Sequence, residues 1–137
     1  MENVDYTSTF ITVAPDFAGV AAVEPVGATV VASTFGLILP APYALRSSDV
    51  IFRVWASRHD VSPDSAEAWT SFFATPRACL RSSDLGKRYG WGIHADGDGR
   101  LAVYGVGSQA YDALASGTAP DGSAVSVKAA MRSSRQV

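Results

Sequence analysis

Hydrophobic residues recur along this chain with two different spacings, and the spacing changes from segment to segment. Alternation at every second position, which places neighbouring side chains on opposite faces of a strand, predicts strands over residues 9–14, 49–57, 89–94, 101–106 and 125–131. Spacings of three and four, which gather apolar side chains on one face of a helix, predict helices over 30–39, 62–75 and 108–116. The predicted order is β-α-β-α-β-β-α-β.

The clearest strand pattern runs from Asp49 to Ser57. One set of its alternating positions is expected to face the core, and this set consists of Val50, Phe52, Val54 and Ala56. Arg53 and Trp55 then fall on the second face, which we expect to be only partly covered.

Capping and turn residues mark the ends of the other elements. Thr29, Ser62 and Ser108 are candidate N-caps, because a hydroxyl accepts a hydrogen bond from the free backbone N–H groups of a first helical turn. Pro63 suits the first helical position after Ser62, since that position needs no N–H donor. The sequence Asp96-Gly97-Asp98-Gly99 predicts the turn of a β-hairpin.

Together these elements predict an α+β fold. One mixed or antiparallel sheet of about five strands, with two or three helices against one face, would bury the apolar positions. The 137 residues fit a single domain, with an ordered core expected over about residues 8–132. A chain of this length buries roughly two thirds of its unfolded surface, so it needs no disulfide or metal to fold.

The composition is that of a folded globular protein, with 47% hydrophobic and 18% charged residues. The net charge of −2 and the pI of about 5.5 argue against nucleic acid and anionic membranes as partners. Cys79 is the only cysteine, so no intramolecular disulfide can form and a reducing compartment is expected. The N-terminus is acidic, and the longest apolar stretch, 28–39, is shorter than the roughly 20 residues that cross a bilayer. We therefore expect a cytoplasmic protein without a membrane-spanning segment.

Residues 79–94 carry most of the candidate chemistry, because cationic, hydroxyl-bearing and aromatic side chains gather there beside three glycines. Guanidinium groups fork onto phosphate or carboxylate oxygens, so this pattern predicts a binding module for a small anionic ligand or a partner protein. The residues that we expect to bind it are Arg81, Ser82, Lys87, Arg88, Trp91 and His94. In this hypothesis the two arginines bind the anion, and the serine and lysine add hydrogen-bond donors. The indole lines one side of the site, and the imidazole makes binding depend on pH.

Four stretches of the chain carry a resemblance to a known family. They are STFITVAPD (8–16), DVIFRVWASRH (49–59), CLRSSDLGKRYGWGIHADGDGRLAVYGV (79–106) and VKAAMRS (127–133). In these stretches the chain resembles the bacterial family known as domain of unknown function 6157, whereas residues 17–48 fit it less well. The resemblance implies a small bacterial protein of this fold. It implies no activity, because the family has none assigned.

Two alternatives to the anion site use the surface of the predicted sheet. Tyr89 and Trp91 would share one strand face, as the base-stacking aromatic residues of RNA-binding sheets do, so single-stranded nucleic acid stays an alternative ligand. The acidic pI argues against it. Homo-oligomerisation through the hairpin or an uncovered sheet face stays open as well, with Arg53 and Trp55 as the natural interface.

A third alternative is an enzyme in which Cys79 and His94 form a thiolate–imidazole pair. Cofactor and metal sites have less support. The sequence GWGIHA (90–95) has the spacing of a dinucleotide-binding motif, but it lies within a predicted strand instead of opening a helix. The two histidines and the cysteine lack the spacing of a zinc site. We expect neither a cofactor nor a metal.

Overall fold

The computed structural model describes residues 1–133. Over this range the chain forms four strands in one mixed sheet, β1 (Thr9–Thr12), β2 (Trp91–Ala95), β3 (Leu101–Gly105) and β4 (Ser126–Ala129). The helices are α1 (Val30–Ile38), α2 (Ser47–Arg58), α3 (Ala66–Phe73) and α4 (Gln109–Ala115), with a 3₁₀ turn η1 (Leu80–Ser82) and a π-helical turn η2 (Leu85–Tyr89). The α+β class and the single sheet are confirmed, but the sheet has four strands where about five were expected.

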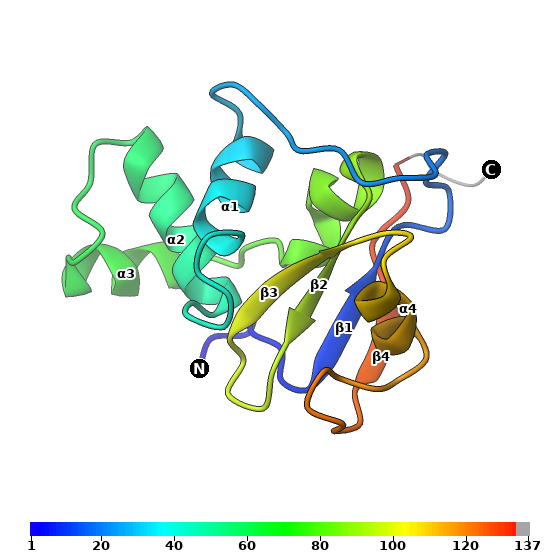
Figure 1. Cartoon of the computed structure of the whole chain (residues 1–137). Coiled ribbons are helices and arrows are strands. Elements are labelled where there is room, and N and C mark those ends of the chain that lie inside the picture. Colours follow the sequence, from blue (N-terminus) through cyan, green and yellow to red (C-terminus); the bar gives the residue numbers. More distant parts are fainter. Residues whose placement is uncertain (134–137) are drawn as a thin grey trace.

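The spatial order of the strands is β3-β2-β1-β4. The β2–β3 hairpin is antiparallel, as the turn at 96–99 predicted, and β2 also pairs antiparallel with β1. The last strand, β4, lies parallel to β1 on its other side. Figure 1 shows α1, α2 and α3 on the side of the molecule near β3, and α4 beside β1 and β4.

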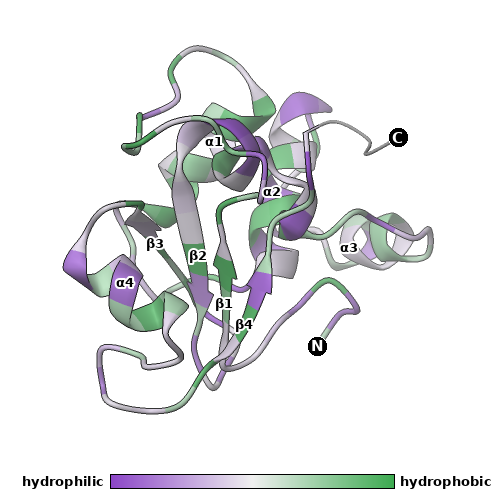
Figure 2. Ribbon diagram, turned by 90° about the vertical axis from the view of Figure 1, so that its right-hand side faces the viewer, coloured by the Kyte–Doolittle hydropathy of each residue, from purple (hydrophilic) through white to green (hydrophobic). Residues whose placement is uncertain are grey.

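Helices cover both faces of the sheet, and not one face as expected. On the first face Ile11 and Ile93 are buried against α1 and α2. On the second face Phe10 is buried against Tyr111 and Leu114 of α4. Alternation along β1 accounts for this arrangement, because Phe10 and Ile11 are neighbours and therefore point to opposite faces. Figure 2 shows hydrophobic residues in both central strands, β1 and β2.

The strand predicted over residues 49–57 is wrong, because this segment forms helix α2. The four residues expected in the core, from Val50 to Ala56, are all buried. Val50 and Val54 pack toward α1 and the sheet, whereas Phe52 and Ala56 pack against Phe72 of α3. A helix held between two partners buries residues on two sides, so its burial repeats at every second position and resembles the pattern of a strand.

Helix α1 begins after Thr29 as predicted, and the hydroxyl of Thr29 accepts a hydrogen bond from the Ala32 N–H. Helix α4 begins after Ser108, also as predicted. Helix α3 begins later than expected, because the hydroxyl of Ser65, and not that of Ser62, accepts from the first turn. Among residues 1–133, every helix falls short of the length and apolarity that a membrane span requires.

The segment between α3 and β2 is more ordered than the loop that its polar residues suggested. It contains η1 and η2, and η2 ends at Gly90, whose φ of 82° lies in the left-handed region that favours glycine. Gly92 follows on β2, at a point where a Cβ atom would lie 2.3 Å from Cζ of Phe10. The lack of a side chain at Gly92 therefore lets Phe10 pack across the second face of the sheet.

Candidate functional site

The structure distributes the six candidate anion-site residues over several places. Arg81 and Ser82 lie in η1. Nε of Arg81 donates a hydrogen bond of 2.8 Å to the backbone oxygen of Ala129 in β4. The hydroxyl of Ser82 donates to the backbone oxygen of Cys79 at 2.7 Å. Both side chains therefore hold η1 in place, one against the sheet edge and one within its own turn.

Lys87 and Arg88 lie in η2, and the structure brings these two cations together. They line a hollow of about 360 Å³, together with residues of the 16–23 loop and Ser133, which we call the Lys87 hollow. Nε of Arg88 is 3.6 Å from a carboxylate oxygen of Asp84, and both side chains are largely exposed. Such an exposed ion pair contributes little to stability, so it leaves Arg88 able to exchange partners.

Trp91 and His94 lie three positions apart on β2 and therefore on opposite faces of the sheet. The indole of Trp91 packs on Phe35 of α1, with ring centroids 4.8 Å apart. Its N–H donates to the backbone oxygen of Val23 at 2.9 Å. This indole thus fixes α1 and the preceding loop to the first face, away from His94.

His94 is the most enclosed of the six residues, with only 4% of its surface exposed. Nδ1 of its ring lies 2.8 Å from the hydroxyl oxygen of Tyr43. The same hydroxyl is 2.7 Å from that of Tyr104 on β3. A chain of three polar groups therefore runs from the histidine on β2 to the neighbouring strand.

Tyr43 reaches this face from the connection between α1 and α2. Its backbone N–H donates to the backbone oxygen of Leu101 at 2.7 Å, so the connection runs along the edge of β3. The backbone of Tyr43 has a φ of 60°, a left-handed conformation that non-glycine residues seldom adopt. Such strain persists only where surrounding contacts hold it, and it is concentrated at functional sites. Here the contacts with Leu101 and His94 hold it.

The second ring nitrogen of His94, Nε2, has no hydrogen-bond partner within residues 1–133. The one fully buried side-chain polar atom without a partner in that range is Oγ of Ser47, so Nε2 of His94 retains contact with solvent. A pocket of about 290 Å³ adjoins the ring. We call it the His94 pocket, and it is lined by Tyr43, His94, Asp96, Pro120 and Asp121.

Burial favours the neutral forms of His94 and Tyr43. It lowers the pKa of His94 below the ordinary value of 6.5, and the carboxylates of Asp96 and Asp121 only partly oppose that shift. Burial also raises the pKa of Tyr43 far above 10, and the hydrogen bond with Tyr104 adds to this rise. At neutral pH the imidazole of His94 and the phenol of Tyr43 are therefore uncharged.

The hydrogen-bonded groups of His94, Tyr43 and Tyr104 can arrange their protons in two ways without any change in charge. In one, Tyr43 donates to Nδ1 of His94, and Nε2 carries the ring proton. In the other, Nδ1 donates to Tyr43, which donates onward to Tyr104, and Nε2 becomes an acceptor. His94 can therefore offer the pocket either a hydrogen-bond donor or an acceptor, at a position fixed by Tyr43.

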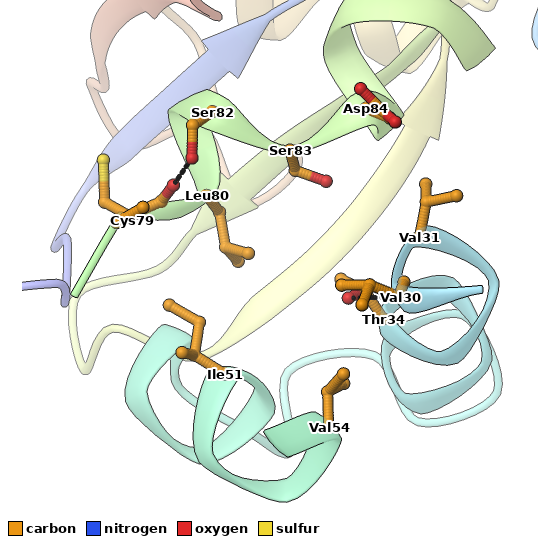
Figure 3. Close-up of a pocket in the computed structure, with 11 residues that line it drawn as sticks. Val30, Val31, Thr34, Ile51, Val54, Cys79, Leu80, Ser82, Ser83 and Asp84 are labelled. Atoms are coloured by element: carbon orange, nitrogen blue, oxygen red, sulfur yellow. Dashed lines mark hydrogen bonds between the residues drawn. The ribbon is translucent and has the colours of Figure 1, made fainter. Parts of the chain in front are cut away.

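Cys79 lies apart from His94 and has a different partner. The hydroxyl of Tyr6 donates to its sulfur at 3.0 Å, and burial together with this bond raises the pKa of Tyr6 to about 12. Cys79 lines a mainly apolar pocket formed with α1 and α2, which pack on the first face of the sheet. Figure 3 shows its sulfur pointing away from Ile51 and Leu80 in that pocket. The thiol and the imidazole are thus on opposite sides of the sheet.

Sequence reasoning included His94 among its candidates but missed the partners that define its pocket. Tyr43, Asp96 and Asp121 come from three separate connections, and the sequence gives no sign that these connections meet. One local signal was available at Asp96, which directly follows the strand that carries His94. Within residues 1–133 no group of three His, Cys, Asp or Glu side chains is arranged to hold a metal ion.

Comparison with curated proteins and with solved structures gave no match. A family model does match the chain, over residues 1–136, and its description is "Family of unknown function (DUF6157)". The match spans nearly the whole chain, including the elements that build the His94 pocket and the Lys87 hollow. The chain therefore belongs to DUF6157, a family of unknown function.

Proposed function

We propose that the protein is a binding module for a small organic molecule that enters the His94 pocket and forms a hydrogen bond with Nε2 of His94. The observation that carries this proposal is a histidine with one ring nitrogen anchored by Tyr43 and the other without a partner in the described part of the chain. Nε2 of His94 retains contact with solvent, so a ligand in the adjoining pocket can replace water as its hydrogen-bond partner. A fixed, unsatisfied ring nitrogen beside a pocket is therefore suited to recognition.

The size of the pocket limits the ligand. Its volume of about 290 Å³ is just below the range for small-molecule sites, roughly 300–1,000 Å³. The lining combines an aromatic ring, a proline and a few polar groups, which is the usual composition of such sites. We therefore expect a compact molecule with one group that hydrogen-bonds to the imidazole.

The test is a screen of small organic fragments followed by NMR on the ring C–H groups of the two histidines. The sequence contains two histidines, so the exposed His59 serves as an internal reference in every spectrum. Fragments that use the pocket shift the His94 signals and leave the His59 signals in place. They also raise the melting temperature, since they bind the folded state.

His94→Asn is the matched variant, because asparagine retains a polar group near the Nδ1 position and lacks Nε2. His59→Asn is the control. The proposal requires that fragments stabilise the wild type and the control but not His94→Asn. A screen in which no fragment moves the His94 signals, or in which His94→Asn binds the same fragments equally well, contradicts it.

A second candidate function is the binding of a small anion in the Lys87 hollow. It is favoured by the two adjacent cations that line that hollow, Lys87 and Arg88. Inorganic phosphate should then stabilise the wild type more than a Lys87→Gln/Arg88→Gln variant. The control is Arg53→Gln/Lys128→Gln, which removes the same charge from exposed positions. Equal stabilisation of both variants would reject this site.

A further inference from the structure

The charged residues that line the His94 pocket are both acidic. Asp96 follows β2, and Asp121 lies in the connection between α4 and β4. Oδ1 of Asp96 accepts from the N–H groups of Asp98 and Arg100, which closes the hairpin turn. Oδ1 of Asp121 accepts from the N–H and hydroxyl of Ser123. One oxygen of each carboxylate is thus used to hold its own turn.

The other oxygen of each carboxylate, Oδ2, has no hydrogen bond within residues 1–133. The hydrogen bonds from Ser123 lower the pKa of Asp121, so this carboxylate stays ionised at neutral pH. The basic residues near the hairpin turn bind elsewhere. Nε of Arg46 donates to the backbone oxygen of Asp98, and Arg100 lies 4.0 Å from the Asp98 carboxylate. No cation of the described chain lines the pocket.

We infer that the ligand of the His94 pocket carries a protonated amine, which binds between the free carboxylate oxygens of Asp96 and Asp121 and donates a hydrogen bond to Nε2 of His94. This inference rests on the proposed function and names its ligand class. An ammonium group has three N–H donors and no acceptor, and the pocket offers three acceptors. An anion would meet two negative charges and no positive one.

The histidine can accept such a donor without becoming charged. Nδ1 of His94 then donates to Tyr43, and Tyr43 donates to Tyr104, which leaves Nε2 as an acceptor. In the other neutral arrangement Tyr43 donates to Nδ1, and Nε2 of His94 carries the proton and can donate it to water in the pocket. The anchoring of His94 by Tyr43 is independent of the acidic pair, and His94 lines the same pocket close enough for the charges of Asp96 and Asp121 to act on it.

Three compounds with one skeleton test the charge of the ligand: benzylamine, benzyl alcohol and benzoate. A ring of this size fits, since a cavity of about 150 Å³ already holds benzene. Binding is followed through the His94 ring C–H signals at about pH 7.5, where the amine is protonated. We expect benzylamine to bind about tenfold more tightly than benzyl alcohol, and benzoate not to bind.

Asp96→Asn and Asp121→Asn are the matched variants, because asparagine keeps the Oδ1 acceptor that closes each turn. Asp98→Asn is the control, since it removes one negative charge from the same hairpin turn outside the pocket lining. Each of the first two variants should reduce the preference for the amine to about threefold or less, and the control should retain it.

The possible results distinguish the inference of a cationic ligand from the proposal that the pocket binds a small molecule. If benzyl alcohol or benzoate shifts the His94 signals as strongly as benzylamine, the pocket binds small molecules but the inference of a cationic ligand is overturned. Amine binding that persists in both aspartate variants overturns it as well. If neither these compounds nor any fragment of the wider screen moves the His94 signals, the proposed function itself is contradicted.

Discussion

The hydroxyl of Tyr43 lies 2.8 Å from Nδ1 of His94. This contact attaches the segment between α1 and α2 to the sheet face on which α4 packs. The two rings meet nearly at a right angle, with centroids 5.5 Å apart. Because the backbone of Tyr43 also bonds to Leu101, the residue spans the edge of β3 and fixes the imidazole from outside the sheet.

Removing the hydroxyl of Tyr43 should destabilise the protein more than removing that of Tyr104. Tyr43→Phe deprives both His94 and Tyr104 of a partner, and we expect a loss of about 1–2 kcal/mol in the free energy of unfolding. Tyr104→Phe leaves the Tyr43–His94 bond intact and should lose less. Urea unfolding of the two variants measures the difference. Equal losses would mean that the bond to His94 contributes nothing.

His94 should make stability depend on pH in a defined direction. Since its pKa in the folded state is lowered from 6.5, the folded state binds fewer protons than the unfolded state just below that pH. Its contribution is fully present above pH 6.5 and is lost as the pH falls through the folded-state pKa. Unfolding free energies of the wild type and His94→Asn should therefore converge on acidification. A difference that stays constant or widens as the pH falls would contradict the lowered pKa.

Glycines 92 and 36 should respond in opposite ways to alanine. A Cβ at Gly92 would lie 2.3 Å from Cζ of Phe10, so Gly92→Ala should lower stability by about 1–3 kcal/mol. A Cβ at Gly36, on the exposed side of α1, meets nothing within 4 Å, so Gly36→Ala should raise stability by roughly 0.5–1 kcal/mol. Thermal unfolding tests the pair, and a stabilised Gly92→Ala protein would disprove the close approach of Phe10.

Tyr6 should ionise at a higher pH than an ordinary tyrosine, whose pKa is about 10. Its pKa of about 12 means that its contribution to stability is complete below pH 10 and is lost as the pH rises toward 12. Absorbance at the phenolate wavelength, compared between wild type and Tyr6→Phe, isolates this one group. Tyr6→Phe should also change the rate at which Cys79 reacts with an alkylating reagent, because the sulfur loses its hydrogen-bond donor. A difference titration centred near pH 10 would contradict the raised pKa that burial and the bond to Cys79 together produce.

Much of the fold follows from local patterns, whereas the one helix predicted as a strand, α2, owes its misleading pattern to tertiary packing. The hairpin, its turn and the caps at Thr29 and Ser108 depend on neighbouring residues, so the sequence predicts them well. Helix α2 was mistaken for a strand because two different partners bury it from two sides. Ser47-Ser48-Asp49 held the missing signal, since the Asp49 carboxylate accepts from the Arg46 N–H at the helix start.

The site was harder to predict than the fold, because it depends on contacts between distant segments. Alternation along β2 already separates Trp91 from His94, so these two could not share a pocket on one face. That Tyr43 would cross the edge of β3, and that Asp121 would approach the hairpin, depends on the path of two connections. Such paths are set by packing of the whole domain, which no short motif encodes.

The most direct test of the account is the protonation state of His94, read from the ¹⁵N shifts of its two ring nitrogens across a pH titration. The account predicts that the ring is neutral in most molecules at pH 6.5, with a proton that moves between Nδ1 and Nε2 when a ligand binds. A ring that is charged above pH 6.5, or whose nitrogen shifts do not respond to any ligand, would contradict it.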